Sequence, residues 1–407
     1  MKAFAANLLL LAVGLCVALA MAEGLAAVAS RGRPCSGRVP LWRPDGAVGW
    51  ALVPGARGDA VVCGANQREI ARHRVEINAL GHRDLPRHRP RDGRRRVLVL
   101  GDSFVEALQV DFDDAFTARL ERLLDAEVLN FGVSGYSTDN ELRAWAHDGR
   151  RYHPDAVLLV LHVGNDVLEN GPRLFLKFPH GLPPKPWLHT TDASPALRAC
   201  LAIDRAAAHL ATLLPDTVWA RSRLARATFT SAVGGGLQLG CADATGPALI
   251  PGVPEGLGVY GEPRTPAWEE GWRETERLLH HLASRVRATG ARFGVALGPV
   301  DAEYDPQRRW YEALQPATRG HEWDFEYPYR RLGGFLARER VPWTSLVPPL
   351  RTHYEVTGDP GSYEWDGHWT ASGHAVVAEA LAPFVAELLT AHPVIGGLTL
   401  DAVPETK

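Results

Sequence analysis

The sequence predicts an α/β fold in which a central parallel β-sheet is covered by helices on both faces. Short apolar runs recur along the chain, among them residues 97–100 and 156–163. Runs of this length and composition are typical of strands that are buried on both sides. They alternate with longer segments whose apolar residues have helical spacing. Such alternation indicates βαβ units, which place the strands parallel to one another in one sheet.

The expected elements can be placed from this pattern. Five strands are expected, at residues 97–100, 128–131, 156–163, 293–297 and 341–346. A helix after the first strand is indicated by the spacing of Phe116, Leu120, Leu123 and Leu124. The helix before the fourth strand has one mainly apolar face, formed by Trp268, Trp272, Thr275, Leu279, Leu282 and Val286. A final helix is expected at residues 372–389.

The α/β domain is expected to span residues 96–395 and to be followed by a short tail at 396–407. Residues 31–95 are rich in proline, glycine and arginine, and we interpret them as an irregular or β-rich lead-in. The segment 171–262 breaks the strand–helix rhythm with many prolines and glycines. We interpret it as a large insertion that forms a cap, with some helix near residues 196–214.

Composition describes an ordinary globular protein. The 407 residues are 46% hydrophobic and 22% charged, and the net charge is −3. These values exclude a disordered chain and give no general attraction to nucleic acid, so no nucleic-acid partner is expected. Basic residues do cluster between Arg68 and Arg96. The cluster predicts a solvated face, and contact with an anionic polymer or a lipid headgroup is the alternative.

The N-terminal segment, residues 1–30, is interpreted as a membrane anchor. Residues 3–22 are almost entirely apolar and, as a helix, are long enough to cross the hydrocarbon core of a bilayer. Arg31 and Arg33 follow this run. A cleaved signal peptide is the alternative, because residues 20–22 match a small-x-small cleavage site. We expect a bacterial envelope protein, held at the inner membrane with its folded domain in the periplasm, or a secreted one if cleavage occurs.

Export makes the cysteines interpretable. Beyond the apolar N-terminus the chain contains Cys35, Cys63, Cys200 and Cys241. An even number of cysteines in an oxidising compartment favours disulfides. Proximity in sequence suggests Cys35–Cys63 and Cys200–Cys241, although four cysteines allow three pairings. The sequence has no CxxC motif and no His-Cys cluster, so a zinc site is not expected.

Polar residues gather where the predicted strands end. Ser103 follows the first strand, Gly135 the second and Asn165 the third. Asp366 and His368 lie beyond the fifth strand. Ligands of open α/β sheets bind outside the carboxyl ends of the strands. We therefore expect these residues to form one site.

These residue types are the ones that acyl transfer requires. A serine hydroxyl is a weak nucleophile and needs an adjacent base, usually histidine. That histidine needs a carboxylate to hold its tautomer and to stabilise its charged form. The oxyanion of the tetrahedral intermediate needs preorganised donors, which glycine turns and an asparagine amide can supply. The pattern predicts Ser103 as nucleophile, His368 as base and Asp366 as the carboxylate that supports it.

In their order and context these motifs resemble the SGNH (GDSL-type) hydrolases, a flavodoxin-like α/β family of esterases, lipases, thioesterases and carbohydrate O-acetylesterases. The similarity is carried by Gly101-Asp102-Ser103, by the stretch from Asn130 to Gly135 and by Gly164-Asn165-Asp166. The resemblance implies a three-layer α/β/α fold around a parallel sheet of about five strands. It also implies an oxyanion hole formed by the Ser103 amide, the Gly135 amide and the Asn165 side chain, with no metal or organic cofactor.

The last motif departs from the commonest family pattern, Asp-x-x-His, because Asp366 and His368 are only two positions apart. Some branches with a similar Asp-x-His-Trp act on exported polysaccharides. Residues two apart in extended backbone face the same side, so Asp366 could still contact the imidazole. His374 is the competing base, although its position suits the N-terminus of a helix. His162, on the third strand, is interpreted as a core histidine.

The resemblance implies an esterase that hydrolyses acyl esters through an acyl-enzyme. An envelope location and the 12 tryptophans, which can stack on sugar rings, favour a short acyl group such as O-acetyl on a glycan as substrate. Three alternatives remain open. The substrate could be a lipid ester or a thioester. The same site could transfer the acyl group to an exported polysaccharide, or the chain could be a non-catalytic component of the envelope that binds glycan.

Overall fold

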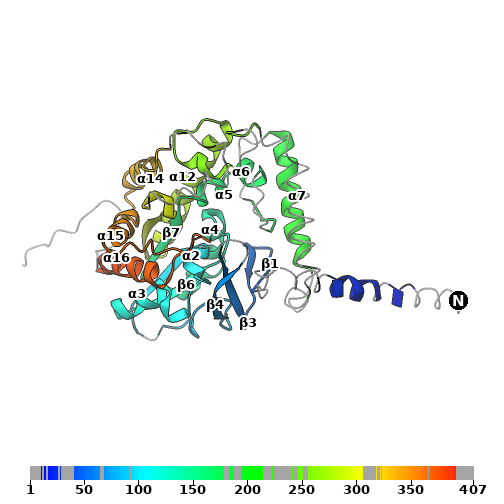
Figure 1. Cartoon of the computed structure of the whole chain (residues 1–407), viewed down its shortest axis with the longest axis horizontal. Coiled ribbons are helices and arrows are strands. Elements are labelled where there is room, and N and C mark those ends of the chain that lie inside the picture. The colour runs from blue at the N-terminus through cyan, green and yellow to red at the C-terminus, as the bar shows by residue number, and fades with distance from the viewer. Residues whose placement is uncertain are drawn as a thin grey trace, which may run out of the picture.

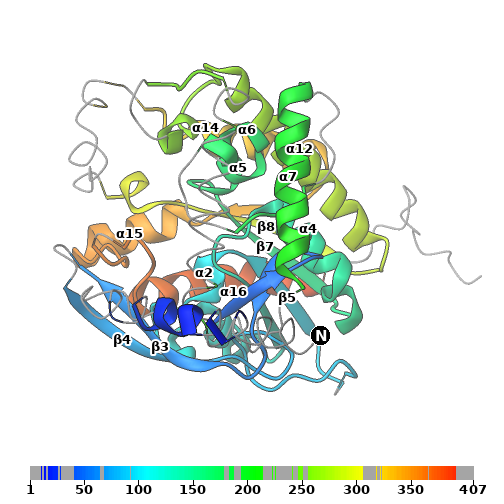
Figure 2. The same ribbon diagram turned by 90° about the vertical axis from the view of Figure 1, so that its right-hand side faces the viewer.

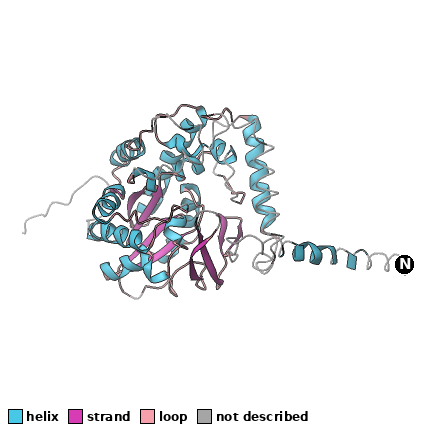
Figure 3. Cartoon of the chain, viewed as in Figure 1, coloured by secondary structure: helices cyan, strands magenta, loops and turns pink. Residues whose placement is uncertain are grey.

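A parallel sheet of five strands forms the centre of the molecule, as the sequence predicts (Figure 3). The computed structural model describes residues 41–64, 68–91, 93–177, 183–187, 194–213, 246–250, 255–305, 323–364 and 366–390, with isolated positions elsewhere. The sheet order is β6-β5-β7-β8-β9, and every neighbouring pair is parallel. The strands are β5 (Arg96–Gly101), β6 (Glu127–Gly132), β7 (Ala156–His162), β8 (Arg292–Gly298) and β9 (Trp343–Ser345).

Helices cover both faces of this sheet, which explains why β5, β6 and β7 are buried along their whole length. One face is covered by α3 (Phe116–Leu124) and α16 (Ala371–Thr390), which also pack against each other. The other face is covered by α4 (Thr138–His147) and α12 (Pro266–Arg287). All six residues of the predicted apolar face of α12 are buried. The remaining elements of the body are α2 (Ser103–Glu106), η2 (Phe112–Asp114), η3 (Gly149–Tyr152), η6 (Asp301–Glu303), α14 (Tyr327–Arg338) and α15 (Val347–Thr357).

Among the described residues, α16 alone is long and apolar enough to cross a membrane by length and composition. It nevertheless packs against β7, β8 and α3, with Val377, Leu381 and Val385 fully buried. A helix with this packing is a core element of the domain. The described helical residues between 11 and 25 project away from the body instead, and their apolar side chains, such as Leu11 and Leu25, are exposed (Figure 1).

The lead-in folds as two antiparallel hairpins that pack on the body. One consists of β1 (Trp42–Asp45) and β2 (Gly49–Leu52), and the other of β3 (Arg57–Cys63) and β4 (Glu69–Glu76). Trp50, which is buried, donates its indole N–H to the Ser134 carbonyl at 2.9 Å, and the Tyr136 hydroxyl donates to the Trp50 carbonyl at 2.6 Å. The lead-in therefore shares a core with the residues that follow β6.

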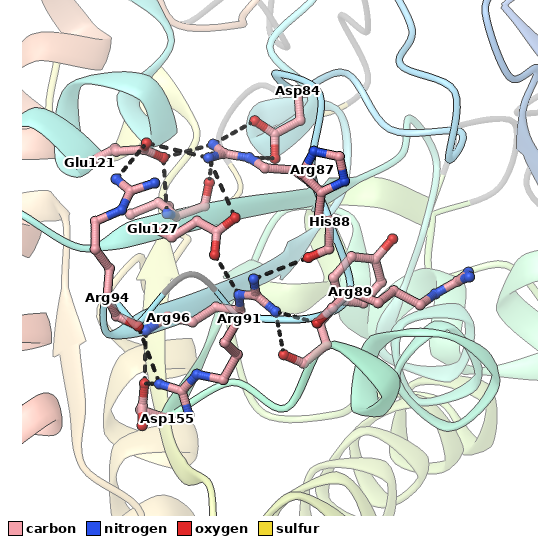
Figure 4. Close-up of polar contacts among 12 residues, drawn as sticks. Asp84, Arg87, His88, Arg89, Arg91, Arg94, Arg96, Glu121, Glu127 and Asp155 are labelled. Carbon is pink, nitrogen blue, oxygen red and sulfur yellow. Dashed lines mark hydrogen bonds and ion pairs between the residues drawn. The ribbon is translucent and has the colours of Figure 1, made fainter.

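Internal ion pairs hold several arginines at the end of the lead-in, while Arg91, Arg94 and Arg95 are exposed to solvent. Figure 4 shows this network, which lies where β5, β6 and β7 begin. Arg96 is buried and donates to Glu127 at 2.6 Å. Arg87 donates to Asp84 at 2.8 Å and to Glu121 at 2.6 Å. These cations are neutralised within the chain, at the sheet edge opposite the predicted site.

Helix α5 (Asp166–Asn170) directly precedes the insertion, which contains α6 (Pro172–Lys177), α7 (Pro195–Ala211) and η5 (Glu255–Val259). Helix α7 stands at the right of the body in Figure 1 and in front of it in Figure 2. A disulfide joins Cys200 on this helix to Cys241, the pairing expected from sequence proximity. Cys63 is also disulfide-bonded, and its expected partner Cys35 lies outside the described residues, as does the tail at 396–407.

Candidate active site

The predicted nucleophile lies at a sharp turn between a strand and a short helix. β5 ends at Gly101 and α2 begins at Ser103, with the Asp102 carboxylate accepting a hydrogen bond from the Phe104 amide at 2.9 Å. The turn lies between β6 and β7, where the chain changes its direction across the sheet, and such switch points are where α/β folds bind ligands. The fold thus exposes Ser103 at the carboxyl edge of the sheet.

Close packing of α2 on the sheet explains one glycine of the second motif. A Cβ atom on Gly132 would lie 2.5 Å from the carbonyl carbon of Val105 and nearer still to the Glu106 amide nitrogen. Both of those atoms belong to the backbone of α2, so only glycine allows the helix to lie this close to β6.

The structure brings Ser103, His368 and Asp366 together. His368 Nε2 lies 2.7 Å from Ser103 Oγ, and His368 Nδ1 lies 2.7 Å from Asp366 Oδ1. The carboxylate can only accept, so Nδ1 carries the proton and the lone pair of Nε2 faces the serine hydroxyl. This is the tautomer that a histidine needs to remove a proton from serine.

A turn, and not extended backbone, brings Asp366 into contact with His368. Gly367 has φ of +81°, in the left-handed region that favours glycine. Its amide donates to the Tyr363 carbonyl at 2.9 Å, and the Tyr363 amide donates to the His368 carbonyl at 2.8 Å. The predicted contact between Asp366 and His368 is present, but this compact loop produces it.

Aromatic side chains pack around the ring of His368. The Phe104 ring lies between His368, at 4.7 Å between ring centroids, and His162, at 4.0 Å. Trp369 contacts Phe104 edge-on at 4.8 Å. The residue after the nucleophile therefore limits the orientations that the His368 ring can adopt.

His374, the competing base, has a structural role. It is buried on α16, and its Nδ1 accepts a hydrogen bond from the Phe116 amide at 3.2 Å. Phe116 is the first residue of α3, whose preceding Ala115 has no side chain to cap the helix. Burial lowers the pKa of His374 to about 3, so its imidazole is neutral at ordinary pH. It therefore caps α3.

The three predicted oxyanion donors lie at neighbouring strand ends. Asn165 precedes α5 and donates from Nδ2 to Asp102 at 2.9 Å, which leaves one amide hydrogen for a substrate. Gly135, with φ of +78°, lies in the turn after β6. Within the part of the chain that the structure describes, the amides of Ser103 and Gly135 donate to no protein group. That all three converge on one oxygen stays a prediction.

His162 is buried, as expected for a core histidine, and both of its ring nitrogens face oxygen atoms. Nδ1 lies 2.9 Å from Asn165 Oδ1 and Nε2 lies 3.1 Å from the Pro299 carbonyl. Burial lowers the pKa of His162, which favours the neutral ring with a single N–H. Its contact with Asn165 makes His162 a support for the predicted oxyanion amide.

A cavity of about 300 Å³ opens beside Ser103 and His368. Strands of the lead-in provide much of its wall, through Leu41, Trp42, Trp50, Leu52, Asp59, Ala60, Val61 and Val62. Glu106, Leu108, Gln109, Val133, Ser134 and Pro183 complete it. The sequence indicated β structure in the lead-in but nothing that placed it against the site, because these contacts are long-range.

One arginine of the lead-in holds the C-terminal end of α2, the helix that begins at Ser103. Arg83 is 1% exposed and donates to the carbonyl groups of Glu106 at 2.8 Å, Val110 at 2.6 Å and Ala107. Burial lowers its pKa to about 10, so the guanidinium remains charged at neutral pH. Sequence reasoning missed Arg83, since it is one basic residue among many in this segment.

Glu106, at the end of α2, in turn holds the glycine turn. Its carboxylate accepts from the Ser134 amide at 2.6 Å and from the Ser134 hydroxyl. Ser134 directly precedes Gly135. Glu106 therefore links α2 to the turn that contains a predicted oxyanion donor.

Buried carboxyl groups lie behind this site. Glu141, Asp166 and Glu169 are buried, and burial raises the pKa of each well above its usual value. Within the described ranges, no group of three or more His, Cys, Asp or Glu side chains has an arrangement that could hold a metal ion.

No protein-family model and no curated protein matches the sequence. Among solved structures, the chain is similar to TesA at 17% identity, over 72% of this chain and 99% of that one, with a TM-score of 0.35. It is similar to a catalytic mutant of Axe2, an acetylxylan esterase from Geobacillus stearothermophilus, at 14% identity, over 74% and 96% of the two chains, with a TM-score of 0.36. A GDSL-like lipase from Bacteroides thetaiotaomicron matches at 12% identity over 74% and 92%, with a TM-score of 0.35. At these values the geometry of the site itself has to decide the function.

Proposed function

We propose that the chain is a serine esterase of the SGNH (GDSL-type) hydrolases, with Ser103 as its nucleophile. One observation supports this above all others, namely the unbroken chain of contacts from Asp366 through His368 to Ser103, each at 2.7 Å. It lies at the carboxyl edge of a parallel sheet and beside a cavity. A protein that only binds glycan has no need of a serine activated in this way.

The reaction begins when His368 Nε2 takes the proton of Ser103 Oγ while this oxygen attacks the carbonyl carbon of an ester. Asp366 stabilises the imidazolium that forms. The oxyanion accepts hydrogen bonds from the amides of Ser103 and Gly135 and from Asn165 Nδ2. The intermediate collapses, and the alcohol leaves with the proton from His368. Water then attacks the acyl-enzyme with His368 again as base, which releases the acid and restores Ser103.

The substrate class follows from the cavity and from the expected location. Apolar and polar side chains share the cavity wall, and about 300 Å³ has room for a sugar ring carrying a short acyl group. The exposed apolar helix at the N-terminus and the Cys200–Cys241 disulfide are typical of an envelope protein outside the cytoplasm. We propose an O-acylated glycan as substrate, with the N-terminal helix as inner-membrane anchor.

Replacement of the nucleophile tests the assignment. Ser103→Ala should abolish hydrolysis of 4-nitrophenyl acetate and covalent labelling by a fluorophosphonate, with the thermal unfolding curve unchanged. Ser284→Ala, at an exposed position of α12, should label and hydrolyse like the wild type. Wild-type protein that neither labels nor hydrolyses would refute the esterase and favour the non-catalytic glycan binder.

Acyl transfer to a polysaccharide is the second candidate, because a sugar hydroxyl can take the place of water in the last step. The same assay, repeated with a soluble oligosaccharide acceptor, separates the two reactions. A hydrolase releases free acid regardless of acceptor, whereas a transferase yields acylated oligosaccharide at the expense of free acid.

A further inference from the structure

The side-chain amide of Gln109 is an unsatisfied polar group in the wall of the cavity. Gln109 follows α2 and is 9% exposed. Its Oε1 is buried and accepts no hydrogen bond, and the described residues contain no partner for its Nε2. Buried amides are nearly always hydrogen-bonded in folded proteins, so one without partners needs an explanation.

The other polar side chains of the cavity outside the triad have partners. Asp59 pairs with Arg72 at 3.4 Å, and the carboxylate of Glu106 accepts from Ser134. Gln109 therefore differs from its polar neighbours in having its hydrogen-bonding capacity free, in the same cavity as Ser103 and His368.

The backbone on both sides of Gln109 is held in place. The carbonyl groups of Ala107 and Val110, on either side, accept hydrogen bonds from the buried Arg83. Because its backbone is held and no described group uses its acceptor or its donor, the Gln109 amide can contact a ligand without first giving up another hydrogen bond.

The amide limits the chemistry of that ligand. A hydroxyl group can donate to Oε1 or accept from Nε2, and a pair of neighbouring hydroxyls can do both. An apolar acyl chain can do neither and would leave the amide unsatisfied. Trp42, Leu41 and Val62 line the same cavity and provide the apolar surface on which the C–H face of a sugar ring packs.

We propose that Gln109 binds a hydroxyl of the carbohydrate that carries the scissile ester, and so selects acylated sugars over esters without hydroxyl groups. The inference rests on the proposed esterase function and adds a residue that determines its specificity. A site that hydrogen-bonds a substrate hydroxyl discriminates strongly against an analogue that lacks it.

The test compares two substrates and one substitution. The substrates are a monoacetate of methyl glucopyranoside and cyclohexyl acetate, which has a similar ring without hydroxyls. Gln109→Met keeps the side-chain length and removes the amide. We expect kcat/KM on the sugar acetate to fall by about 10- to 100-fold and kcat/KM on cyclohexyl acetate to stay the same or rise.

One further measurement separates a binding role from a structural one. Thermal unfolding of Gln109→Met should occur at the wild-type temperature or above it, because the substitution removes a buried polar group without partners. Equal losses on both substrates, or no loss on the sugar acetate, would overturn the proposal.

The failure of the proposed function would be recognised separately. If wild-type Ser103 does not react with a fluorophosphonate, the esterase is refuted, and binding of methyl glucopyranoside by calorimetry then decides the role of Gln109. Weaker binding by Gln109→Met than by wild type would support a sugar contact, whereas equal binding or none would refute it.

Discussion

Replacing Gly132 with alanine should displace the nucleophile without touching any residue that reacts. The added methyl group would lie 2.5 Å from the Val105 carbonyl carbon, whereas ordinary contact begins at 3.4 Å. The obstacle is the backbone of α2, which has no side chain that can rotate out of the way. Helix α2 or strand β6 therefore has to move by roughly 1 Å, and a shift of this size at a reacting group costs about 10²-fold in rate.

The shift would act on the contact between Ser103 Oγ and His368 Nε2, which is 2.7 Å in the intact protein. We expect kcat for 4-nitrophenyl acetate to fall by about 10²-fold. Fluorophosphonate labelling should slow in parallel, because it depends on the same activated oxygen. The free energy of unfolding should fall by about 1–3 kcal/mol, the usual cost of an extra methyl group in a packed site.

Two other glycines provide a graded comparison. At Gly101 an added Cβ would meet mainly the side chain of Val105, which can change rotamer, so Gly101→Ala should cost less activity. At Gly261 the added Cβ has no atom within 4 Å, and Gly261→Ala should be indistinguishable from wild type. A folded Gly132→Ala that retains wild-type kcat would refute the idea that close packing on β6 positions Ser103.

Three more perturbations test the surroundings of the site. Asp366→Asn should lower kcat by about 10⁴-fold with little change in KM, because an amide no longer holds the His368 proton on Nδ1. Wild-type kinetics would show that Asp366 has no part in the mechanism. Arg83→Met leaves three carbonyl groups without their donor, and each unsatisfied group costs about 1–3 kcal/mol. The free energy of unfolding, measured in urea, should fall by about 3 kcal/mol or more. An unchanged midpoint would contradict this role of Arg83. His374 has a pKa of about 3 in the folded protein, below its value of about 6.5 in the unfolded chain. Its contribution to the free energy of unfolding is therefore complete above pH 6.5 and is lost as the pH falls towards 3. The loss is up to about 1.36 kcal/mol per pH unit. His374→Asn, which keeps an acceptor for the Phe116 amide and does not titrate, should unfold with a shallower acid dependence, and an identical slope would contradict the assignment.

The sheet could be predicted because each strand is a local signal. The run at 156–163 is apolar except for His162, since helices cover both faces, and the structure has β7 at Ala156–His162. The strand expected at 341–346 is shorter in the structure, Trp343–Ser345, and β9 lies at the edge of the sheet where fewer residues are enclosed. The contact between Ser103 and His368 could be predicted from the residue types and the order of the motifs rather than from strand ends, because α15 separates His368 from the end of β9.

What the sequence could not predict depends on contacts between distant segments. Arg83 resembles its neighbouring arginines in sequence, yet it is buried against α2 while Arg87 and Arg96 pair with carboxylates at the opposite edge. Gln109 has no motif around it, and its importance comes from what surrounds it in space. The turn at Gly367 could have been suspected from an Asp-Gly pair, but its φ of +81° is fixed by the loop around it.

The position of the lead-in has a consequence for where the enzyme can reach. Its first described residue, Leu41, already lines the cavity, and only 12 residues separate it from Val28, the last described helical position of the N-terminal segment. A chain of that length spans at most about 45 Å when fully extended. With the N-terminal helix retained in a bilayer, the mouth of the cavity is tethered within that radius of the membrane surface. Under that condition, the cavity could act only on ester substrates within this distance of the membrane.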